Sequence, residues 1–263
     1  MKYKYPFTNT LTFALVMEDP KLSRGLLQLI FPEREIREVK LHEATVETEK
    51  TVIAGIELRK VRLDVLFEDS NEWYDIEMQS RNEHNIPKRS RYAHGIMDVH
   101  HLKVSRDFND LKSSYVIFLC CFDPFDRGDA VYNFGMIDEE KNLPLGDENY
   151  TIVLNSKTKD PRIPEALRQL FRYMNDSIVS EDNELLLQID EAVRSWNTGE
   201  RLEIIMTLEE EILRKEALAR KEGFEEGSEQ KKLEIAKNLK NKGVEMNIIV
   251  ESTGLNEETV QNL

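Results

Sequence analysis

Apolar and polar residues alternate along residues 62–79, and this pattern predicts a β-hairpin. Leu63, Val65 and Phe67 alternate with Arg62, Asp64 and Leu66, and Tyr74, Ile76 and Met78 alternate with Asp75, Glu77 and Gln79. A period of two is typical of half-buried strands, and the polar residues 68–71 supply a turn. If the turn is centred between Ser70 and Asn71, Asp64 lies directly opposite Glu77, with the two Cβ atoms about 5 Å apart.

The facing carboxylates of Asp64 and Glu77 allow two interpretations. An antiparallel hairpin normally has one apolar and one solvated face, and acids on the solvated face are ordinary. Alternatively, a divalent cation bound by hard oxygen ligands removes the repulsion between two carboxylates at this distance. The pattern alone favours the solvated face, and the surrounding residues shift the balance toward the cation.

The rest of the first 200 residues predicts a layered α/β core. Helices are expected at residues 10–31, interrupted at Asp19-Pro20, and at 87–103, 165–173 and 183–194. A buried strand is expected at 115–122 and further strands at 131–136 and 150–154, whereas 35–48 fits either a helix or an extended segment. Strands followed and covered by helices indicate an α/β fold. Expected core positions are Phe13, Val16, Leu26, Leu27 and Ile30, with Tyr92, Ile96, Val99 and the stem of Lys103 on the apolar face of the third helix.

The composition changes near residues 197–199, so we divide the chain into a domain at 1–200, a charged helical arm or linker at 201–230 and a small helical tail at 231–263. Leu202–Arg220 is rich in helix-forming Glu, Leu, Arg and Lys, and Gly223 and Gly227 predict a break before a helix at 233–239. The tail resembles a helix-turn-helix, with Gly254 in the turn. The first turn of its last helix carries acids instead of the cations of a DNA-reading helix, which favours partner binding, including a homo-oligomer through the C-terminal helices.

Composition and charge exclude some classes of protein. The 263 residues are 40% hydrophobic, which supports a packed core, and the net charge of −14 argues against a protein that coats nucleic acid. A nuclease stays compatible, because binding depends on local charge. Cys120 and Cys121 are neighbours on a predicted strand, which suggests two reduced thiols. With no signal-peptide pattern and no apolar run near the ~20 residues that span a bilayer, we expect a cytoplasmic protein that does not bind membranes.

Residues 82–106 form a basic segment in this acidic chain. This stretch contains only two acids, Glu83 and Asp98, but five cations: Lys88, Arg89, Arg91, Lys103 and Arg106. Lys88 and Arg91 share a helix face, and Lys88, Arg89, Arg91 and Tyr92 are our candidates for DNA contacts; a solvated helix face is the competing interpretation. His94, Asp98 and His101 also share a face at a spacing that could bind a transition metal, but a hydrogen-bonded polar stripe is the favoured interpretation.

Ordered motifs along the chain resemble the PD-(D/E)xK nuclease family of transposases, also called recombination-promoting nucleases (Rpn). The motifs are Asp64 with Glu77-x-Gln79, and residues 7–17, 62–65, 76–79, 87–92, 115–120, 122–125, 145–147 and 152–155, so the resemblance covers roughly residues 7–200. The family departs from the usual nuclease motif in having Gln where Lys is common, here Gln79. The resemblance implies a restriction-endonuclease-like mixed sheet flanked by helices, here with a helical C-terminal extension.

The resemblance also implies a metal-dependent DNA endonuclease that hydrolyses phosphodiesters, with Mg²⁺ or Mn²⁺ as cofactor. Asp64, Glu77 and Gln79 are the candidate catalytic residues, and the candidate metal ligands are Asp64, Glu77 and the backbone carbonyl of Met78. Gln79 cannot act as a base or carry positive charge, although its carbonyl can orient a water molecule or touch the metal.

One position departs from the family pattern. The usual Asn-Asp pair near the start of the family is Asn9-Thr10 here. Either an acid is dispensable at this position, Glu18 replaces it, or this copy is catalytically inactive and binds DNA or a protein partner through the same fold.

Overall fold

The computed structural model describes residues 2–37, 39–42, 66–69, 72–102 and 107–263, and the candidate ligand Asp64 therefore lies outside the described residues. The chain divides into two compact units, Met1–Leu202 and Glu203–Leu263. The first unit contains the predicted α/β core and the second is helical.

A six-stranded mixed sheet organises the first unit, with the strand order β1-β2-β3-β4-β8-β5. Its strands are β1 (Lys40–His42), β2 (Leu66–Asp69), β3 (Glu72–Gln79), β4 (Ser113–Cys120), β5 (Val131–Phe134) and β8 (Asn149–Asn155). β3, β4 and β8 run parallel, while β1, β2 and β5 join antiparallel to their neighbours. Gln79, Cys120 and Asn155 lie in register at the ends of the three parallel strands, and we call this side of the sheet the carboxyl edge. The mixed sheet flanked by helices confirms the predicted fold class.

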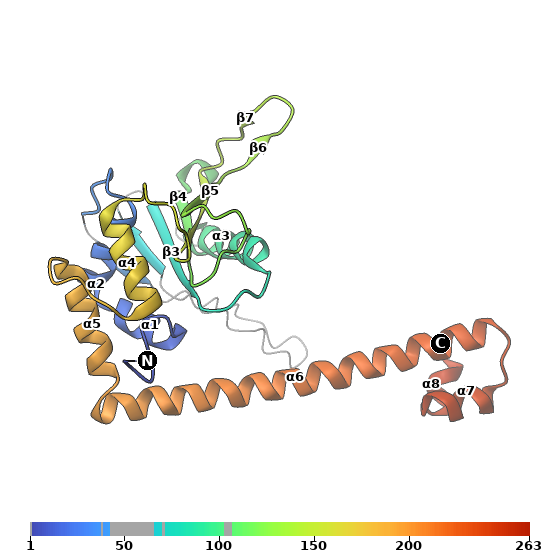
Figure 1. Ribbon diagram of the computed structural model, residues 1–263. Helices are drawn as coiled ribbons and strands as arrows, with labels where there is room; N and C mark the ends of the chain where they lie inside the picture. Colours follow the sequence, from blue (N-terminus) through green and yellow to red (C-terminus); the bar gives the residue numbers. More distant parts are fainter. Residues whose placement is uncertain (1, 38, 43–65, 70–71, 103–106) are drawn as a thin grey trace. The chain divides into compact units, whose positions relative to one another are not determined.

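Four helices cover one face of the sheet (Figure 1). They are α1 (Thr10–Met17), α2 (Pro20–Ile30), α4 (Glu165–Asp176) and α5 (Glu184–Trp196). Phe13, Leu26 and Ile76 belong to the apolar core on this face and are completely buried. The predicted break between the first two helices is confirmed, since Pro20 begins α2 and the Asp19 carboxylate accepts a hydrogen bond from the Lys21 N–H. Pro is favourable there because its missing N–H has no partner in the first helical turn.

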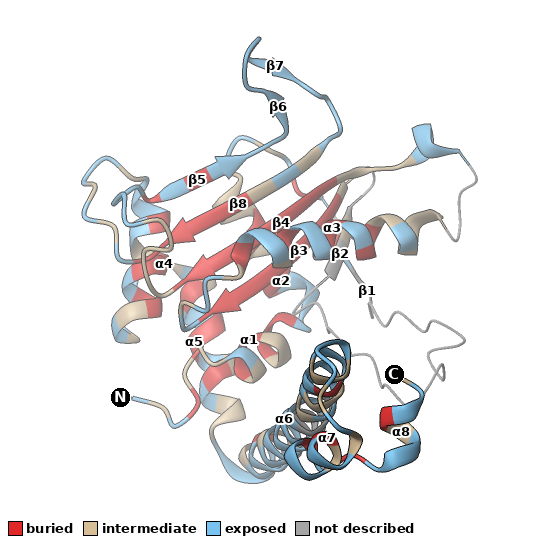
Figure 2. Ribbon diagram, turned by 90° about the vertical axis from the view of Figure 1, so that its right-hand side faces the viewer, coloured by how far each residue is buried: buried red, intermediate tan, exposed pale blue. Residues whose placement is uncertain are grey.

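The opposite face is covered by α3 (Ile86–Leu102), which connects β3 to β4 together with a short 3₁₀ turn, η1 (Phe108–Asp110) (Figure 2). A second apolar cluster fills this layer and includes Ile96, Met97 and Phe118. The start of the helix near Pro87 is confirmed. Its predicted apolar face is right for Ile96 and wrong for Tyr92 and Val99, while Lys103 lies outside the described residues. Tyr92 and Val99 are each 52% exposed, because α3 turns Ala93, Ile96 and Met97 toward the sheet instead.

The expectation of a half-buried hairpin is also wrong for β3. Asp75, Glu77 and Gln79 are 0%, 1% and 5% exposed, so the polar face of the strand is as buried as its apolar face. The reason is topological: β4 pairs with the other side of β3, and the helix that connects them lies over the face that was expected to be solvated. The acids of β3 are therefore part of the interior.

A short ribbon that the sequence pattern did not predict follows β5. It consists of β6 (Ile137–Asp138) and β7 (Leu143–Pro144), which pair antiparallel as a separate sheet. The expected strand at 131–136 therefore ends at Phe134, and the chain leaves the main sheet before returning as β8.

The second unit contains α6 (Gly199–Asn241) from Glu203 onward, α7 (Met246–Thr253) and α8 (Glu257–Gln261). The predicted break at Gly223 and Gly227 is wrong, because both lie inside the 43-residue α6. Each glycine costs about 1 kcal/mol in a helix, and the surrounding Glu, Lys, Leu, Ala and Arg offset that cost. The predicted helix at 233–239 is the last part of the same α6.

The end of α6 packs with the two short helices around a small core of Ala236, Ile249, Leu255 and Val260. The turn is as predicted: Gly254 adopts a φ of 69°, which only glycine reaches without strain, and the Asn256 side chain caps α8. No helix among the described residues has both the length and the apolar character required to cross a bilayer.

Candidate active site

Three polar side chains of β3 lie in a row under α3. Asp75, Glu77 and Gln79 are two residues apart, so they project from the same face of the strand. All three are buried, and the row ends at the carboxyl edge with Gln79. Burying carboxylates is unfavourable unless they are paired, hydrogen-bonded or bound to a cation. Their compensation therefore decides what this face can do.

Glu77 has two neighbours that the structure defines. The guanidinium of Arg89, from the first turns of α3, forms an ion pair with Glu77 Oε2. The Gln79 Nε2 donates a hydrogen bond to the same oxygen at 3.2 Å. Burial raises the pKa of Glu77 above its ordinary value, while the charge of Arg89 and a hydrogen bond with Asp75 act in the opposite direction. Because burial is the larger effect, Glu77 is a carboxylate that gains from an additional cation.

Arg89 therefore lies apart from the other predicted DNA contacts. Its side chain is 33% exposed and is directed toward Glu77. Lys88, Arg91 and Tyr92 are exposed on the outer side of α3, with Gly95 on the same side and open space around its Cα. The structure thus brings Lys88, Arg91 and Tyr92 together on one surface and gives Arg89 a position between that surface and the acids of β3.

The pairing of β2 with β3 follows the register that the sequence argument assumed. Leu66 is opposite Asp75 and Glu68 is opposite Trp73. Asp64 itself lies outside the described residues, so its position opposite Glu77 stays a prediction. The Met78 side chain is 2% exposed and packs in the core on the other face, as expected, while the role of its carbonyl stays a prediction.

The unusual Asn9-Thr10 pair is located at the beginning of α1. The Asn9 side chain accepts a hydrogen bond from the Thr12 N–H at 3.1 Å and caps the helix, and Thr10 is the first helical residue and is exposed. Glu18 is exposed at the other end of α1. Asn9 therefore has a local structural role that does not depend on the residue that follows it.

Further along α3, the ring of His94 contacts hydroxyl groups on β4 and β8. Its Nδ1 lies 2.7 Å from Ser114 Oγ, and its Nε2 lies 3.3 Å from Thr151 Oγ1. The Ser114 hydroxyl donates to Asn149 Oδ1 at 2.6 Å, so it accepts from the Nδ1–H of His94. Burial lowers the pKa of His94 to about 4, which keeps the ring neutral near pH 7. These contacts support the hydrogen-bonded interpretation, and within the described residues no group of three His, Cys, Asp or Glu is arranged to hold a metal.

Sequence reasoning missed two features of this site. Asp75 precedes Glu77 by two residues, so the same alternation that selected Glu77 and Gln79 could have selected Asp75 as well. The inward position of Arg89 has a weaker signal: Arg89 is three residues after the buried Ile86 and four before the buried Ala93, which places it on the inner side of α3.

A mixed sheet with buried acids near the carboxyl end of a parallel strand, covered by a crossover helix, places this protein in the α/β class. Residues 17–170 match the model of the PD-(D/E)XK nuclease family transposase, and this chain belongs to that family. The resemblance found in the motifs is confirmed, and the matched region includes Asp64, Glu77, Gln79 and Arg89. No curated protein and no solved structure matches the chain significantly. Membership in the family implies nuclease-type chemistry on DNA, and nucleases of this kind generally use divalent metal ions.

Proposed function

We propose that this protein is a metal-dependent DNA endonuclease of the transposase or recombination-promoting type, which hydrolyses phosphodiester bonds at the carboxyl edge of β3. The catalytic residues in this proposal are Asp64, Glu77 and Gln79. The single observation that carries it is the buried Glu77, whose raised pKa reflects burial that its neighbours do not fully offset. A carboxylate in this state binds a cation more readily than a solvated one, because the cation relieves an existing electrostatic cost.

The available donor atoms suit Mg²⁺ or Mn²⁺. Carboxylate and carbonyl oxygens are the ligands that such hard cations prefer, and β3 offers them from Glu77, the Met78 carbonyl and Gln79. Asp64 completes the proposed set, and Asp75, buried beside Glu77, is an additional candidate. A bound ion of this kind lowers the pKa of a coordinated water and neutralises charge on the phosphate.

We propose that Arg89 supplies the positive charge that is missing because position 79 is Gln and not Lys. Gln79 orients polar groups through its amide but carries no charge, whereas the Arg89 guanidinium is always charged and forms planar, forked hydrogen bonds. Since Arg89 contacts Glu77 and remains a third exposed, it can keep that carboxylate oriented and still meet a phosphate oxygen. We therefore treat Arg89 as a positioning residue for Glu77, with Lys88, Arg91 and Tyr92 as DNA contacts on the outer side of α3.

A plasmid-nicking assay tests the proposal. Wild-type protein with Mg²⁺ or Mn²⁺ should nick supercoiled plasmid, and Glu77→Ala and Asp64→Ala should each reduce the rate by about a hundredfold or more, since even outer-shell partners of a metal contribute 10- to 100-fold. Glu191→Gln, which removes an exposed acid on α5, is a matched control that should keep the wild-type rate. Equal rates for wild type and Glu77→Ala, or no nicking with any divalent metal, would contradict the proposal.

A nuclease-fold protein that binds DNA or a protein partner without cutting is the alternative. It is favoured by Thr10 in place of the usual acid and by Arg89, whose ion pair occupies one oxygen of Glu77. Salt-dependent binding of a DNA duplex without cleavage, together with no heat of Mn²⁺ binding in calorimetry, would support this second function.

We also propose that the chain self-associates through α6. Leu202, Leu213, Phe224 and Ile235 recur every eleven residues, a spacing that keeps them on one side of a helix. Leu213 and Phe224 are 58% and 78% exposed, which is unusual for large apolar side chains unless they meet a partner.

Cys120 and Cys121 are free thiols, and this supports a proposed reducing, cytoplasmic environment.

A further inference from the structure

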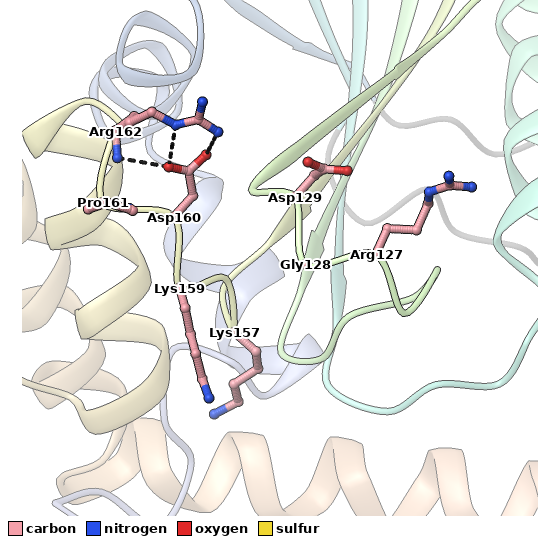
Figure 3. Close-up of a pocket in the computed structure, with 8 residues that line it drawn as sticks. All are labelled: Arg127, Gly128, Asp129, Lys157, Lys159, Asp160, Pro161 and Arg162. Carbon is pink, nitrogen blue, oxygen red and sulfur yellow. Dashed lines mark hydrogen bonds and ion pairs between the residues drawn. The ribbon is translucent and has the colours of Figure 1, made fainter.

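A basic cavity lies among the loops at the end of β8 and the beginning of β5 (Figure 3). Its volume is about 540 Å³. The residues around it come from two loops, and they are Arg127, Gly128, Asp129, Lys157, Lys159, Asp160, Pro161 and Arg162. Four are cations and two are acids, so the cavity carries a surplus of positive charge in a chain whose net charge is −14. The cavity is shallow and open to solvent, and a basic surface region in an acidic protein attracts anions.

Hydrogen bonds hold the two loops of the cavity in a fixed geometry. The Thr158 hydroxyl donates to the Gly128 carbonyl at 2.8 Å, and the Asn155 amide donates to the Asp129 carbonyl at 3.0 Å. Within the first loop, the Asp123 carboxylate accepts from the Gly128 N–H at 2.7 Å and from the Tyr132 hydroxyl at 2.9 Å. Because these bonds use backbone groups and residues behind the cavity, its cations are presented by a preorganised frame. Preorganisation reduces the entropy lost when a ligand binds.

The cations of the cavity are not equally available. Arg162 is held by Asp160, through Nε at 2.8 Å and Nη2 at 2.7 Å, so this pair is electrically balanced. Figure 3 shows that Lys157 and Lys159 extend from their loop in the same direction, while Arg127 projects from the other loop. Arg127, Lys157 and Lys159 carry three positive charges against the one negative charge of Asp129, so the cavity has a surplus of two positive charges.

The cavity is connected with the candidate active site through the carboxyl edge. Asn155, Cys120 and Gln79 lie in register across β8, β4 and β3. The Cys121 N–H donates to the Gln79 carbonyl at 2.9 Å, and the charge of Lys157 lowers the pKa of Cys121 against the larger opposite effect of burial. Two strand spacings separate β8 from β3, which is about 10 Å. The cavity residues follow β8 or precede β5, the next strand in the sheet, so the cavity lies at least this far from β3. Since nucleotides rise about 3.4 Å along a duplex, the separation corresponds to about three nucleotides or more.

We propose that this cavity binds backbone phosphates of the DNA strand that passes Glu77, at least about three nucleotides from the bond to be cut. The inference deepens the proposed nuclease function and rests on it for the path of the strand. Arg127, Lys157 and Lys159 contact phosphate oxygens without reading bases, so the cavity contributes affinity and register and no sequence preference. Free inorganic phosphate offers the same chemistry, and the experiment separates the two sources.

The test measures binding of a fluorescent DNA duplex by anisotropy, without divalent metal, across a series of salt concentrations. The variant Arg127→Gln/Lys157→Gln/Lys159→Gln should bind about tenfold or more weakly at low salt, and the slope of log K against log salt should decrease by about three. The control Arg220→Gln/Lys231→Gln/Lys237→Gln removes the same charge from exposed positions of α6 and should retain the wild-type slope.

Each outcome decides the matter. An unchanged salt slope in the cavity variant overturns the proposal, and so do equal losses of affinity in the two triple variants. The proposal is also overturned if inorganic phosphate raises the Tm of wild type alone while the cavity variant binds the duplex as well as wild type does. If the triple variant does not fold, Lys159→Gln alone should reduce the slope by about one. Plasmid nicking by wild type is scored separately: loss of binding in the variant without nicking by wild type upholds the cavity and contradicts the nuclease function.

Discussion

The two faces of β3 are equally buried and serve different purposes. Tyr74, Ile76 and Met78 pack with α1 and α2 in a continuous apolar core, whereas Asp75 and Glu77 lie under α3 among polar groups. Burying an apolar side chain stabilises the fold by about 1.5–3 kcal/mol, while burying a carboxylate costs several kcal/mol before compensation. One strand thus carries a stabilising face and a costly face side by side. Proteins keep such a cost mainly where function requires it, so the comparison supports the proposal that the α3 face carries the active site.

The cost of burying polar groups under α3 is compensated in two ways. Near the middle of the helix, His94 is satisfied by the neutral hydroxyls of Ser114 and Thr151. Near the carboxyl edge, Glu77 is partly compensated by the charged Arg89. A neutral network fixes the helix on the sheet, whereas a charged pair at the edge can exchange partners with a cation or a phosphate. Three experiments test this contrast between the two faces and the two compensations, and a fourth tests the proposed self-association through α6.

Ile76→Ala should produce the largest loss of stability. The side chain is completely buried on the apolar face, and truncation leaves a cavity that costs about 2–5 kcal/mol. Urea unfolding should show this loss, while calorimetry should give an unchanged Mn²⁺ affinity for the folded protein, because Ile76 points away from the acids. A weaker Mn²⁺ affinity at full folding would contradict the separation of the faces.

Arg89→Met should destabilise the protein by about 3 kcal/mol, since removal of one partner leaves a buried charge without its counter-ion. This value is at the lower end for such pairs because Arg89 is partly exposed and Glu77 can take up a proton. Glu77→Gln/Arg89→Met, in which both charges are absent, should recover much of the loss, and Arg89→Lys should recover part of it. Additive effects in this double-mutant cycle would show that the two side chains are not coupled.

The sequence was sufficient for most elements of the α/β core and for the family, but it could not predict the environment of β3. The break at Pro20 and the cap of α8 at Asn256 were predictable, because both depend on neighbouring residues only. Burial of the polar face of β3 was not predictable, since it depends on a helix and a strand that come later in the chain. Alternation in a strand defines two faces, but it does not say whether a distant element covers the second one.

The candidate site shows the same limit. Glu77 and Gln79 were identifiable from spacing, and Asp75 could have been identified by the same rule. The inward direction of Arg89 was hidden, because a cation in a basic segment is most often solvated and only the packing of α3 decides its side. The continuity of α6 through Gly223 was also hidden, because it depends on a small difference in helix propensity. Two glycines did not outweigh a long run of helix-forming residues.

The burial of His94 should make stability depend on pH. An unfolded histidine takes up a proton below about pH 6.5, whereas burial holds the pKa of His94 at about 4 in the folded protein. Between these values the unfolded state binds more protons, so stability rises with pH across this window and falls by at most about 3 kcal/mol as the pH decreases to 4. The Asp147 carboxylate, which acts on His94 in the opposite direction, limits the effect.

His94→Gln, which keeps a polar side chain without a titrating ring, should lose this part of the pH dependence. The measurement is the difference between wild type and variant in the free energy of unfolding, at several pH values between 4 and 7. A constant difference across this range would show that His94 is not held neutral by the packing of α3 on the sheet.

The smallest effect on stability is expected in the second unit. Phe224→Glu and Leu213→Glu replace exposed side chains of α6, so each should change the free energy of unfolding of a subunit by less than about 0.5 kcal/mol. The mass from light scattering should nevertheless fall in both variants if α6 mediates self-association, because a charge in the eleven-residue stripe cannot be buried in a helix–helix contact. Lys237→Glu, on the same helix but outside the stripe, is the control that should keep the wild-type mass. Equal masses for all four proteins would remove α6 as an interface, and the exposed apolar stripe would then have no self-association to explain it.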